Sequence, residues 1–435
     1  MMLKRRVITA VAGMVAAALA LSACGGGVKP GGGAAASGIT LWGVSGGVRE
    51  EAWKNSFAAW NKANADAQIT AEVIANDAYK ERIRTALGAG TNPTVFFHWG
   101  GGTLKEYVTG KKVLDITAGT ENVLKRVLPS VAKGGMVDGK VYAVPNGPSQ
   151  PVLMYYNKEL FDKVGAKVPT TWDELMDAVT KFNAAGITPF ALAGQSRWPY
   201  LMWIQYLTDR IGGPDVFQAV LDGKADAWSD PAIASALKHI QEIVKAKGFG
   251  DSYASVSADS DADIALLYSG KAAMLMQGGW AYSSFKTGAA DWVKAGKLGL
   301  APFPTVAGGA GDAANIVGNP ATFWSVSSNA SEGQVTAAKR YIDEMVMTDT
   351  YADTLIAGGA VPPVAGIEAK LKSQEDAEFL TFAYGLVRDA PHFQLSWDQA
   401  LAPAQADALL TNLDKVFLLE STPEDFVAAM NKTLG

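Results

Sequence analysis

Strand-like and helix-like segments alternate regularly near the start of the main body of this chain. Residues 39–43, 68–74 and 94–99 have the apolar or alternating pattern of strands, and residues 48–62 and 78–89 have helical spacing. This order favours a mainly parallel sheet with helices on both faces, because parallel strands need a crossover connection. We therefore expect an α/β protein. Further strands are predicted at 152–156, 272–277, 298–302 and 322–327, and Thr171 is predicted to cap a helix.

The first residues have the layout of a bacterial secretion signal. Three basic residues at 4–6 precede an apolar run at 7–20, and Leu-Ser-Ala at 21–23 leads to Cys24, the single cysteine. The segment resembles a lipoprotein signal, in which the cysteine is acylated and becomes the new N-terminus. The alternatives are plain secretion and an uncleaved anchor, but a helix of about 21 Å is short for a hydrocarbon core of about 30 Å. We expect residues 1–23 to be the signal and residues 24–38 to be a flexible, lipid-anchored tether.

The composition narrows the classes of function. The formal net charge is −5, and it becomes more negative once the three basic residues of the signal are removed. An acidic body argues against binding nucleic acid or anionic lipid. With three histidines and one cysteine in 435 residues, a zinc or iron site would have to rely on carboxylates, so no metal or other cofactor is expected. The phosphate-binding Gly-Lys-Ser/Thr motif is also missing from the sequence.

Two short patterns have both a catalytic or metal-binding interpretation and a structural one. Residues 43–47 match G-x-S-x-G, and a serine hydrolase would use Ser45 with His392, oriented by Asp389 or Asp398. In a glycine-rich chain we favour a strand-to-helix loop, where Ser45 can still donate a hydrogen bond. The aspartates at 259, 261 and 263 resemble the start of a calcium loop, but Ile264 and Gly270 stand where that loop needs Gly and Glu. They are interpreted as a solvated helix cap.

Tryptophans at strand ends and in loops are the strongest functional signal among the 12 tryptophans of the chain. Ligands bind at the carboxyl ends of strands in open α/β sheets, and flanking glycines allow close approach to the backbone. Trp99 precedes three glycines, and Trp280 follows Gly278 and Gly279. Helically spaced tryptophans such as Trp172 are interpreted as core. The tryptophans predicted to contact a ligand are Trp42, Trp99, Trp198, Trp280 and Trp397.

A cleft rich in tryptophan and poor in histidine suits a sugar, which has an apolar C–H face and a rim of hydroxyls. Covering about 100 Å² of that face with one ring contributes about 2.5 kcal/mol. Association costs about 4–15 kcal/mol, so polar contacts must supply the net affinity. The polar candidates near strand ends are Ser45, His98, Asn146, Asn319, Arg388 and Gln394.

Six segments in a fixed order carry a resemblance to a known family. They are residues 94–99, 137–145, 155–158, 169–175 and 272–281, together with the C-terminal helix. In this order, behind a lipoprotein-like signal, the chain resembles an extracellular solute-binding protein of a carbohydrate ABC importer and is similar in plan to the maltodextrin-binding proteins. The resemblance covers nearly the whole body, from Ile39 to Leu434.

The resemblance implies a two-lobed, type II periplasmic-binding-protein-like fold, each lobe a mainly parallel sheet flanked by helices, with a hinge and an interlobe sugar site. We expect residues 39–150 plus 273–322 in the first lobe and residues 151–272 plus 323–435 in the second. By family pattern, Trp99 and Trp280 are sugar-stacking positions on or beside the first lobe, and Trp198 and Trp397 are aromatic positions on the second. The family often has an acidic residue where three glycines follow Trp99 here. The implied protein is a lipid-anchored, non-enzymatic monomer that delivers its ligand to an ABC permease.

The ligand and the rival functions remain open at the level of sequence. The chain resembles actinobacterial binders of short oligosaccharides, and xylobiose or related xylo-oligosaccharides are the first expectation. Chitobiose or N-acetylglucosamine comes next. One rival is an exported hydrolase that uses Ser45 or a pair of carboxylates. Another is a receptor for a non-sugar solute such as a polyamine, which would need carboxylates beside the aromatics. The loops around Trp99 and Trp280 lack them in sequence.

Overall fold

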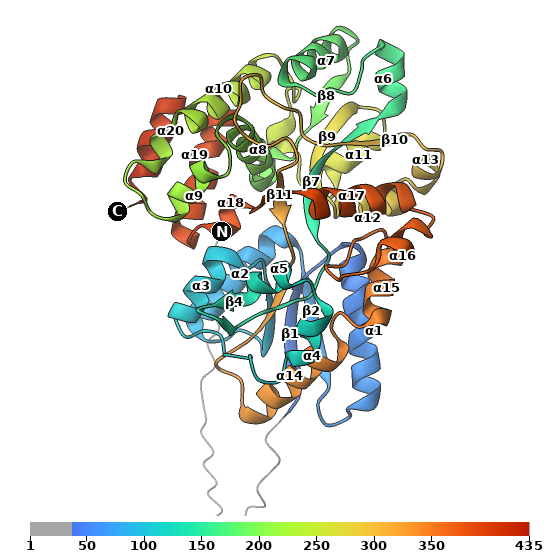
Figure 1. The fold of residues 1–435 in the computed structure, drawn as a ribbon, viewed down its shortest axis with the longest axis vertical. Helices are drawn as coiled ribbons and strands as arrows, with labels where there is room; N and C mark the ends of the chain where they lie inside the picture. The colour runs from blue at the N-terminus through green and yellow to red at the C-terminus, as the bar shows by residue number, and fades with distance from the viewer. Residues whose placement is uncertain (1–36, 435) are drawn as a thin grey trace, which may run out of the picture. The chain divides into compact units, whose positions relative to one another are not determined.

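The computed structural model describes residues 37–434. The predicted signal, Cys24 and all but the last two residues of the predicted tether lie outside this range. Within it, no helix has both the length and the apolar character needed to cross a bilayer. The body is a single compact unit from Ala35 onward, in which two sheets are connected by several crossings of the chain (Figure 1).

The first sheet contains the predicted β-α-β-α-β beginning. Its strand order is β2-β1-β3-β12-β6, and β1 is parallel to both β2 and β3. The expectation from residues 39–99 is therefore confirmed. β12 returns antiparallel to β3 because it enters from the second sheet. The strands are β1 (Ile39–Val44), β2 (Ile69–Ile74), β3 (Val95–His98), β6 (Val144–Pro145) and β12 (Phe323–Val326), and a small hairpin is formed by β4 (Met136–Val137) and β5 (Lys140–Val141).

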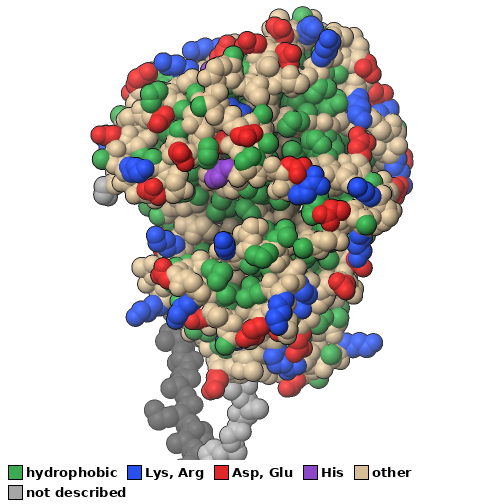
Figure 2. Space-filling view, viewed as in Figure 1, with side chains coloured by type: hydrophobic (Ala, Val, Ile, Leu, Met, Phe, Trp, Pro, Cys, Tyr) green, Lys and Arg blue, Asp and Glu red, His purple; other side chains and the backbone are tan. Residues whose placement is uncertain are grey.

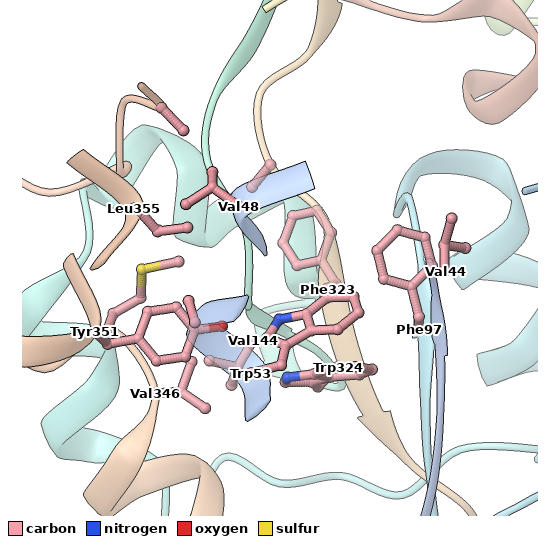
Figure 3. Close-up of a cluster of buried hydrophobic side chains, with 14 of the residues drawn as sticks. Val44, Val48, Trp53, Phe97, Val144, Phe323, Trp324, Val346, Tyr351 and Leu355 are labelled. Carbon is pink, nitrogen blue, oxygen red and sulfur yellow. The ribbon is translucent and has the colours of Figure 1, made fainter. Parts of the chain in front are cut away.

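The helices of the first lobe pack around this sheet, and its core is built on aromatic contacts. Trp53 lies 4.6 Å from Trp324 and 5.8 Å from Phe97 between ring centroids (Figure 3). Tyr351 closes the other side of this cluster. The helices of this lobe are α1 (Gly47–Ala63), α2 (Asn76–Ala89), α3 (Gly101–Thr109), α4 (Glu121–Arg126), α5 (Pro129–Ala132), α14 (Glu332–Met345) and α15 (Asp349–Ala357).

The second sheet is mixed, with the long strand β7 at its centre. β7 is antiparallel to β9, β10 and β11, while β8 is parallel to β9 and β11 is parallel to β13. The antiparallel pairs of β7 differ from the mainly parallel sheet that the sequence predicts for this lobe. The strands are β7 (Gln150–Asn157), β8 (Thr188–Ala191), β9 (Ala272–Gly278), β10 (Leu298–Ala301), β11 (Ile316–Asn319) and β13 (Phe393–Leu395).

Both faces of the second sheet are covered by helices. Along β7, Leu153 and Tyr155 face a core that is continuous with the first lobe, and Val152 and Met154 face the second core. The first face packs on α11 (Ala262–Tyr268), α12 (Ala281–Gly288), α13 (Ala290–Lys294), α16 (Glu368–Lys372) and α17 (Ala377–Asp389). The second packs on α6 (Lys158–Val164), α7 (Trp172–Ala184), α8 (Leu201–Gly212), α9 (Asp215–Leu221), α10 (Pro231–Lys245), α18 (Trp397–Ala400), α19 (Pro403–Phe417) and α20 (Pro423–Asn431).

Strand pairing corrects the expected division of the chain between the lobes. The segment 273–322, expected in the first lobe, contains β10, β11 and nearly all of β9, which belong to the second sheet. β12, expected in the second lobe, pairs with β3 and β6 of the first. The chain crosses between the lobes at 146–149, at 320–322 and again at 358–367, between α15 and α16. The expected division fails because β9 pairs with the central strand β7 of the second sheet. The two strands are antiparallel, with Val152 opposite Gly278 and Tyr156 opposite Met274.

We expect the start of α7 to depend on its predicted cap. The Thr171 side chain accepts from the Glu174 backbone N–H at 3.2 Å, and the Glu174 carboxylate accepts from the Thr171 N–H, so a capping box is present. Thr171→Ala should lower the free energy of unfolding by about 1 kcal/mol because the helix loses this partner. Urea denaturation followed by circular dichroism measures it. Thr180→Ala, at an exposed position later in the same helix, is the control and should change it little. Equal stability of both variants would contradict the role of the cap.

Candidate functional site

A cavity of about 240 Å³ lies between the two sheets. Its walls come from the carboxyl end of β1, the starts of α1 and α2, the ends of β9 and β11, and α18. In the surface view, hydrophobic side chains gather at the level where the two lobes meet (Figure 2). The end of β1 and the turn after it contribute Ser45 and two glycines, so the wall follows the carboxyl end of a parallel strand, as expected for a sheet of this kind.

Three of the five predicted tryptophans line this cavity: Trp99, Trp198 and Trp280. Trp198 and Trp280 meet edge to face, with 5.8 Å between ring centroids. Gly278 makes the position of Trp280 possible, because a Cβ at residue 278 would lie 1.9 Å from the indole ring. Trp99 packs its edge on Phe97 at 4.7 Å. The cavity therefore presents flat apolar surface from both lobes.

Two predicted polar residues, Ser45 and Asn319, also line the cavity. Asn319 Oδ1 is shielded from solvent and accepts no hydrogen bond from the described protein atoms. The Trp198 Nε1–H is also shielded from solvent and donates to none of the described protein atoms. Buried polar atoms are normally paired, so these two atoms are available to a ligand that brings its own donor and acceptor.

Several polar lining residues were missed by sequence analysis. They are Arg49, Lys80, Gln150, Gln205, Asp259, Asp261, Gln277 and Asp398. The signal for Arg49 was present, because it lies in the first turn of the helix that follows β1. Its guanidinium lies 5.1 Å from the centroid of Trp53 and 5.0 Å from that of Phe97. Burial lowers the pKa of Arg49 to about 10, so it remains charged at neutral pH.

Asp259 and Asp261 are exposed, as their interpretation as a solvated cap predicts, but they also line the cavity. Asp261 stands at the N-cap position of α11 without capping it, and Asp259 accepts from the Asp77 backbone N–H at 3.1 Å. Partial desolvation at the cavity wall raises the pKa of both carboxyls. Asp263 is buried behind them, accepts from Gln277 at 2.8 Å, and has its pKa raised to about 6 by burial. Among residues 37–434, no group of three potential ligands is placed to hold a metal ion.

Three predicted ligand contacts are buried in the protein and are corrected. His98 bonds to Ser325 at 2.8 Å and accepts from the Gly100 N–H at 3.0 Å. Asn146 bonds to Thr322 at 2.8 Å. Trp397 stacks on Phe217, with 4.1 Å between ring centroids and 5° between planes. Each side chain is already used in the core, so none faces the cavity.

The other three predicted contacts also lie outside the cavity wall. Trp42 is covered by the Arg82 guanidinium, 4.1 Å from its ring centroid. Arg388 is exposed and pairs with Asp389 at 2.7 Å. Gln394 accepts from His392 at 3.1 Å and donates to the Leu395 carbonyl. His392 is therefore engaged away from Ser45, and the triad that a hydrolase would need is not assembled among the described residues.

Comparison with known proteins agrees with this geometry. Residues 46–349 match the family described as bacterial extracellular solute-binding protein. The chain belongs to this family. Its two-lobed, type II-like α/β fold is that of solved solute-binding proteins.

Two solved structures and one curated protein illustrate the relation of this solute-binding protein to others. A structure from a study of xylan utilization by the bacterium Caldanaerobius polysaccharolyticus is 30% identical, covers 92% of this chain and all of that one, and gives a TM-score of 0.80. A chitin oligosaccharide binding protein is 22% identical, with a TM-score of 0.82 over 91% of this chain and 98% of that one. An uncharacterized ABC transporter extracellular-binding protein of Pyrococcus horikoshii is 26% identical over 61% of this chain and 60% of its own length. The match covers about half to three-fifths of the length of the first curated relatives.

Burial of His98 in this solute-binding protein predicts a pH dependence of stability. Its pKa is lowered to about 3 by burial, whereas an unfolded histidine titrates near 6.5. Between these values only the unfolded state binds the proton, so stability is lost as pH falls below about 6.5. Relative to His98→Asn, the wild type should lose up to about 1.36 kcal/mol of unfolding free energy per pH unit.

Urea denaturation of both proteins from pH 8 to pH 4 measures this difference. Asparagine keeps an oxygen acceptor for the Gly100 N–H and does not titrate, so it removes the proton-binding term while replacing one of the two hydrogen bonds. Parallel stability curves for the two proteins would show that His98 does not remain neutral in the folded state.

Proposed function

We propose that this chain captures a short oligosaccharide in the interlobe cavity and delivers it to an ABC permease. Xylobiose or a related xylo-oligosaccharide is the proposed ligand, followed by chitobiose or N-acetylglucosamine. The observation that carries the proposal is that Trp99, Trp198 and Trp280 line one cavity, together with the unpaired atoms Asn319 Oδ1 and Trp198 Nε1.

The cavity has the two kinds of surface that a pyranose ring requires. An indole ring covers the apolar C–H face, and each ring that is fully covered contributes about 2.5 kcal/mol. Hydroxyl groups both donate and accept, so they can bond to Asn319 Oδ1, to Trp198 Nε1 and to the carboxylates and amides of the wall. Three rings would contribute about 7.5 kcal/mol, which lies within the cost of association of about 4–15 kcal/mol, so the net affinity also needs the polar contacts.

The relatives support the sugar class without deciding the sugar. One similar structure comes from work on xylan utilization, and another is a chitin oligosaccharide binding protein. These two polymers correspond to the two proposed ligands. The second is below 25% identity, so it supports the fold and only the general class of ligand.

Delivery, rather than chemistry, is the proposed outcome of binding. The family consists of extracellular binding proteins, and Ser45 has no histidine beside it in the described structure. We propose that Cys24 is lipidated, that residues 24–38 tether the body to the outer face of the cell membrane, and that the protein acts as a monomer. The sugar should therefore be recovered intact after long incubation with the protein.

A cationic solute is the second candidate, and one observation favours it. Asp259 and Asp261 line the same cavity as Trp198 and Trp280. Carboxylates beside aromatic faces suit an ammonium group. Spermidine therefore belongs in the same titration as the sugars.

We expect a saturable change in tryptophan fluorescence when the body, residues 39–435, is titrated with xylobiose. Trp280→Ala should weaken binding by about 2.5 kcal/mol, or on the order of 70-fold, because one stacking surface is lost. Trp42→Ala removes a tryptophan outside the cavity and should leave the affinity unchanged.

The panel of ligands decides between the candidates. Saturation by xylobiose, chitobiose or another oligosaccharide supports the sugar receptor and identifies its ligand. Saturation by spermidine alone would show that the cavity binds a cationic solute and not a sugar. If no ligand gives a response, or if Trp42→Ala weakens binding as much as Trp280→Ala, the stacking site is refuted.

A further inference from the structure

Gly101 and Gly102, two of the three glycines after Trp99, allow the backbones of the two lobes to meet. Gly101 and Gly102 form the first turn of α3, in the first lobe. A Cβ at Gly102 would lie 2.4 Å from the carbonyl oxygen of Leu401, and a Cβ at Gly101 would lie 2.3 Å from that of Gln399. Both carbonyls belong to α18 or the residue after it, in the second lobe. Because the opposing atoms are backbone, they cannot turn aside as a flexible side chain can.

Helix α2 extends this contact with a stripe of polar groups. Residues 77, 80 and 84 are spaced so that they share one helical face. The Asp77 N–H donates to Asp259 at 3.1 Å, Lys80 pairs with Asp398 at 3.4 Å, and Arg84 pairs with Asp407 at 2.7 Å. All three partners are carboxylates of the second lobe.

This contact is continuous with the cavity. We use the term seam for α2 and the first turn of α3 on one side, and for Asp259, α18 and the start of α19 on the other. Lys80, Trp99, Asp398 and Gln399 belong to the seam or adjoin it, and all four line the cavity. The Lys80 ammonium also lies 5.3 Å from the centroid of Trp99, so the seam and the stacking ring are in contact.

We infer that the seam sets the affinity for the ligand by determining how fully the lobes close, with Gly102 as its steric determinant and Arg84 as an electrostatic one. This inference rests on the proposed function. Apparent affinity falls in proportion to the fraction of molecules in the binding-competent state. A group that holds the two backbones apart therefore weakens binding without touching the ligand. Gly102 and Arg84 both lie outside the cavity wall.

The test compares Gly102→Ala with Gly88→Ala. Alanine at either position needs no left-handed backbone. A Cβ at Gly88, near the end of α2, meets nothing within 4 Å. Small-angle X-ray scattering reports the separation of the lobes, and fluorescence titration with xylobiose reports the dissociation constant. We expect Gly102→Ala to increase the radius of gyration and to raise the dissociation constant by about tenfold or more, whereas Gly88→Ala matches the wild type.

A charge swap between Arg84 and Asp407 is the second test. It distinguishes repulsion between the lobes from a folding defect. Arg84 is half exposed and Asp407 is exposed, so neither is needed to fill a core. Arg84→Glu should open the seam by repulsion and weaken binding by a few-fold, and Arg84→Glu with Asp407→Arg should restore both readouts. A general loss of stability would not be rescued in this way. The melting temperature of every variant serves as the check on folding.

The possible outcomes distinguish a failure of the seam from a failure of the proposed function. Wild-type scattering and affinity for Gly102→Ala, or failure of the charge swap to restore Arg84→Glu, would overturn the seam while leaving a sugar receptor in place. If xylobiose and the other solutes do not bind even the wild type, the proposed function fails. In that case the scattering comparison between Gly102→Ala and Gly88→Ala still shows whether the seam controls closure.

Discussion

The arrangement of the two lobes depends on a set of hydrogen bonds around Asn146, where two crossings of the chain lie together. The Asn146 N–H donates to the Thr322 carbonyl, the Thr322 hydroxyl donates to Asn146 Oδ1, and the Ser149 hydroxyl donates to the Pro320 carbonyl. The Asn146 carbonyl accepts from both Trp53 and Tyr351. These bonds fix the crossing segments to each other and to the core of the first lobe. A buried carbonyl with two donors costs little, whereas the loss of its partners would be expensive. Pro148 and Asn319, which lie in or next to these crossing segments, line the cavity. The hydrogen bonds around Asn146 therefore help to position the cavity wall.

Local sequence patterns were sufficient to predict the first half of the first sheet. The strands and helices from Ile39 to His98 alternate, each with its own periodicity, and the structure confirms them. The division between lobes was not predictable in this way, because the choice of partner for β9 or β12 is a contact between distant segments. β12 begins four residues after β11 ends, yet it pairs with β3, more than 200 positions away. Periodicity identifies a strand but does not specify its partner.

The same limit explains which site residues were found. Trp99 and Trp280 were found because each follows a strand and is flanked by glycines, which is visible in sequence. Trp397 was predicted from a loop-like run that contains no glycine, and it is stacked on Phe217, a residue of another helix. Asp259 was missed because its partner, the Asp77 N–H, lies 182 positions away. The glycines after Trp99 were visible as a departure from an acidic family pattern. Gly101 and Gly102 are needed because the backbone carbonyls of Gln399 and Leu401 lie against them, and only the fold places those carbonyls there.

The charges of the cavity bear on the choice between a sugar and a cationic solute. Arg49 lines the cavity and makes no ion pair within the described structure, and its pKa remains well above neutral. Asp259 and Asp261 line the same space, and partial desolvation raises their pKa values. A cation that pairs with these carboxylates would leave the Arg49 guanidinium unpaired in a region of low dielectric, at a cost that grows with burial. Hydroxyl groups accept from guanidinium and donate to carboxylate, so one polyol can bond to both kinds of charged group in the wall. The presence of both signs of charge around the tryptophan rings therefore favours a neutral polyol over a polyamine.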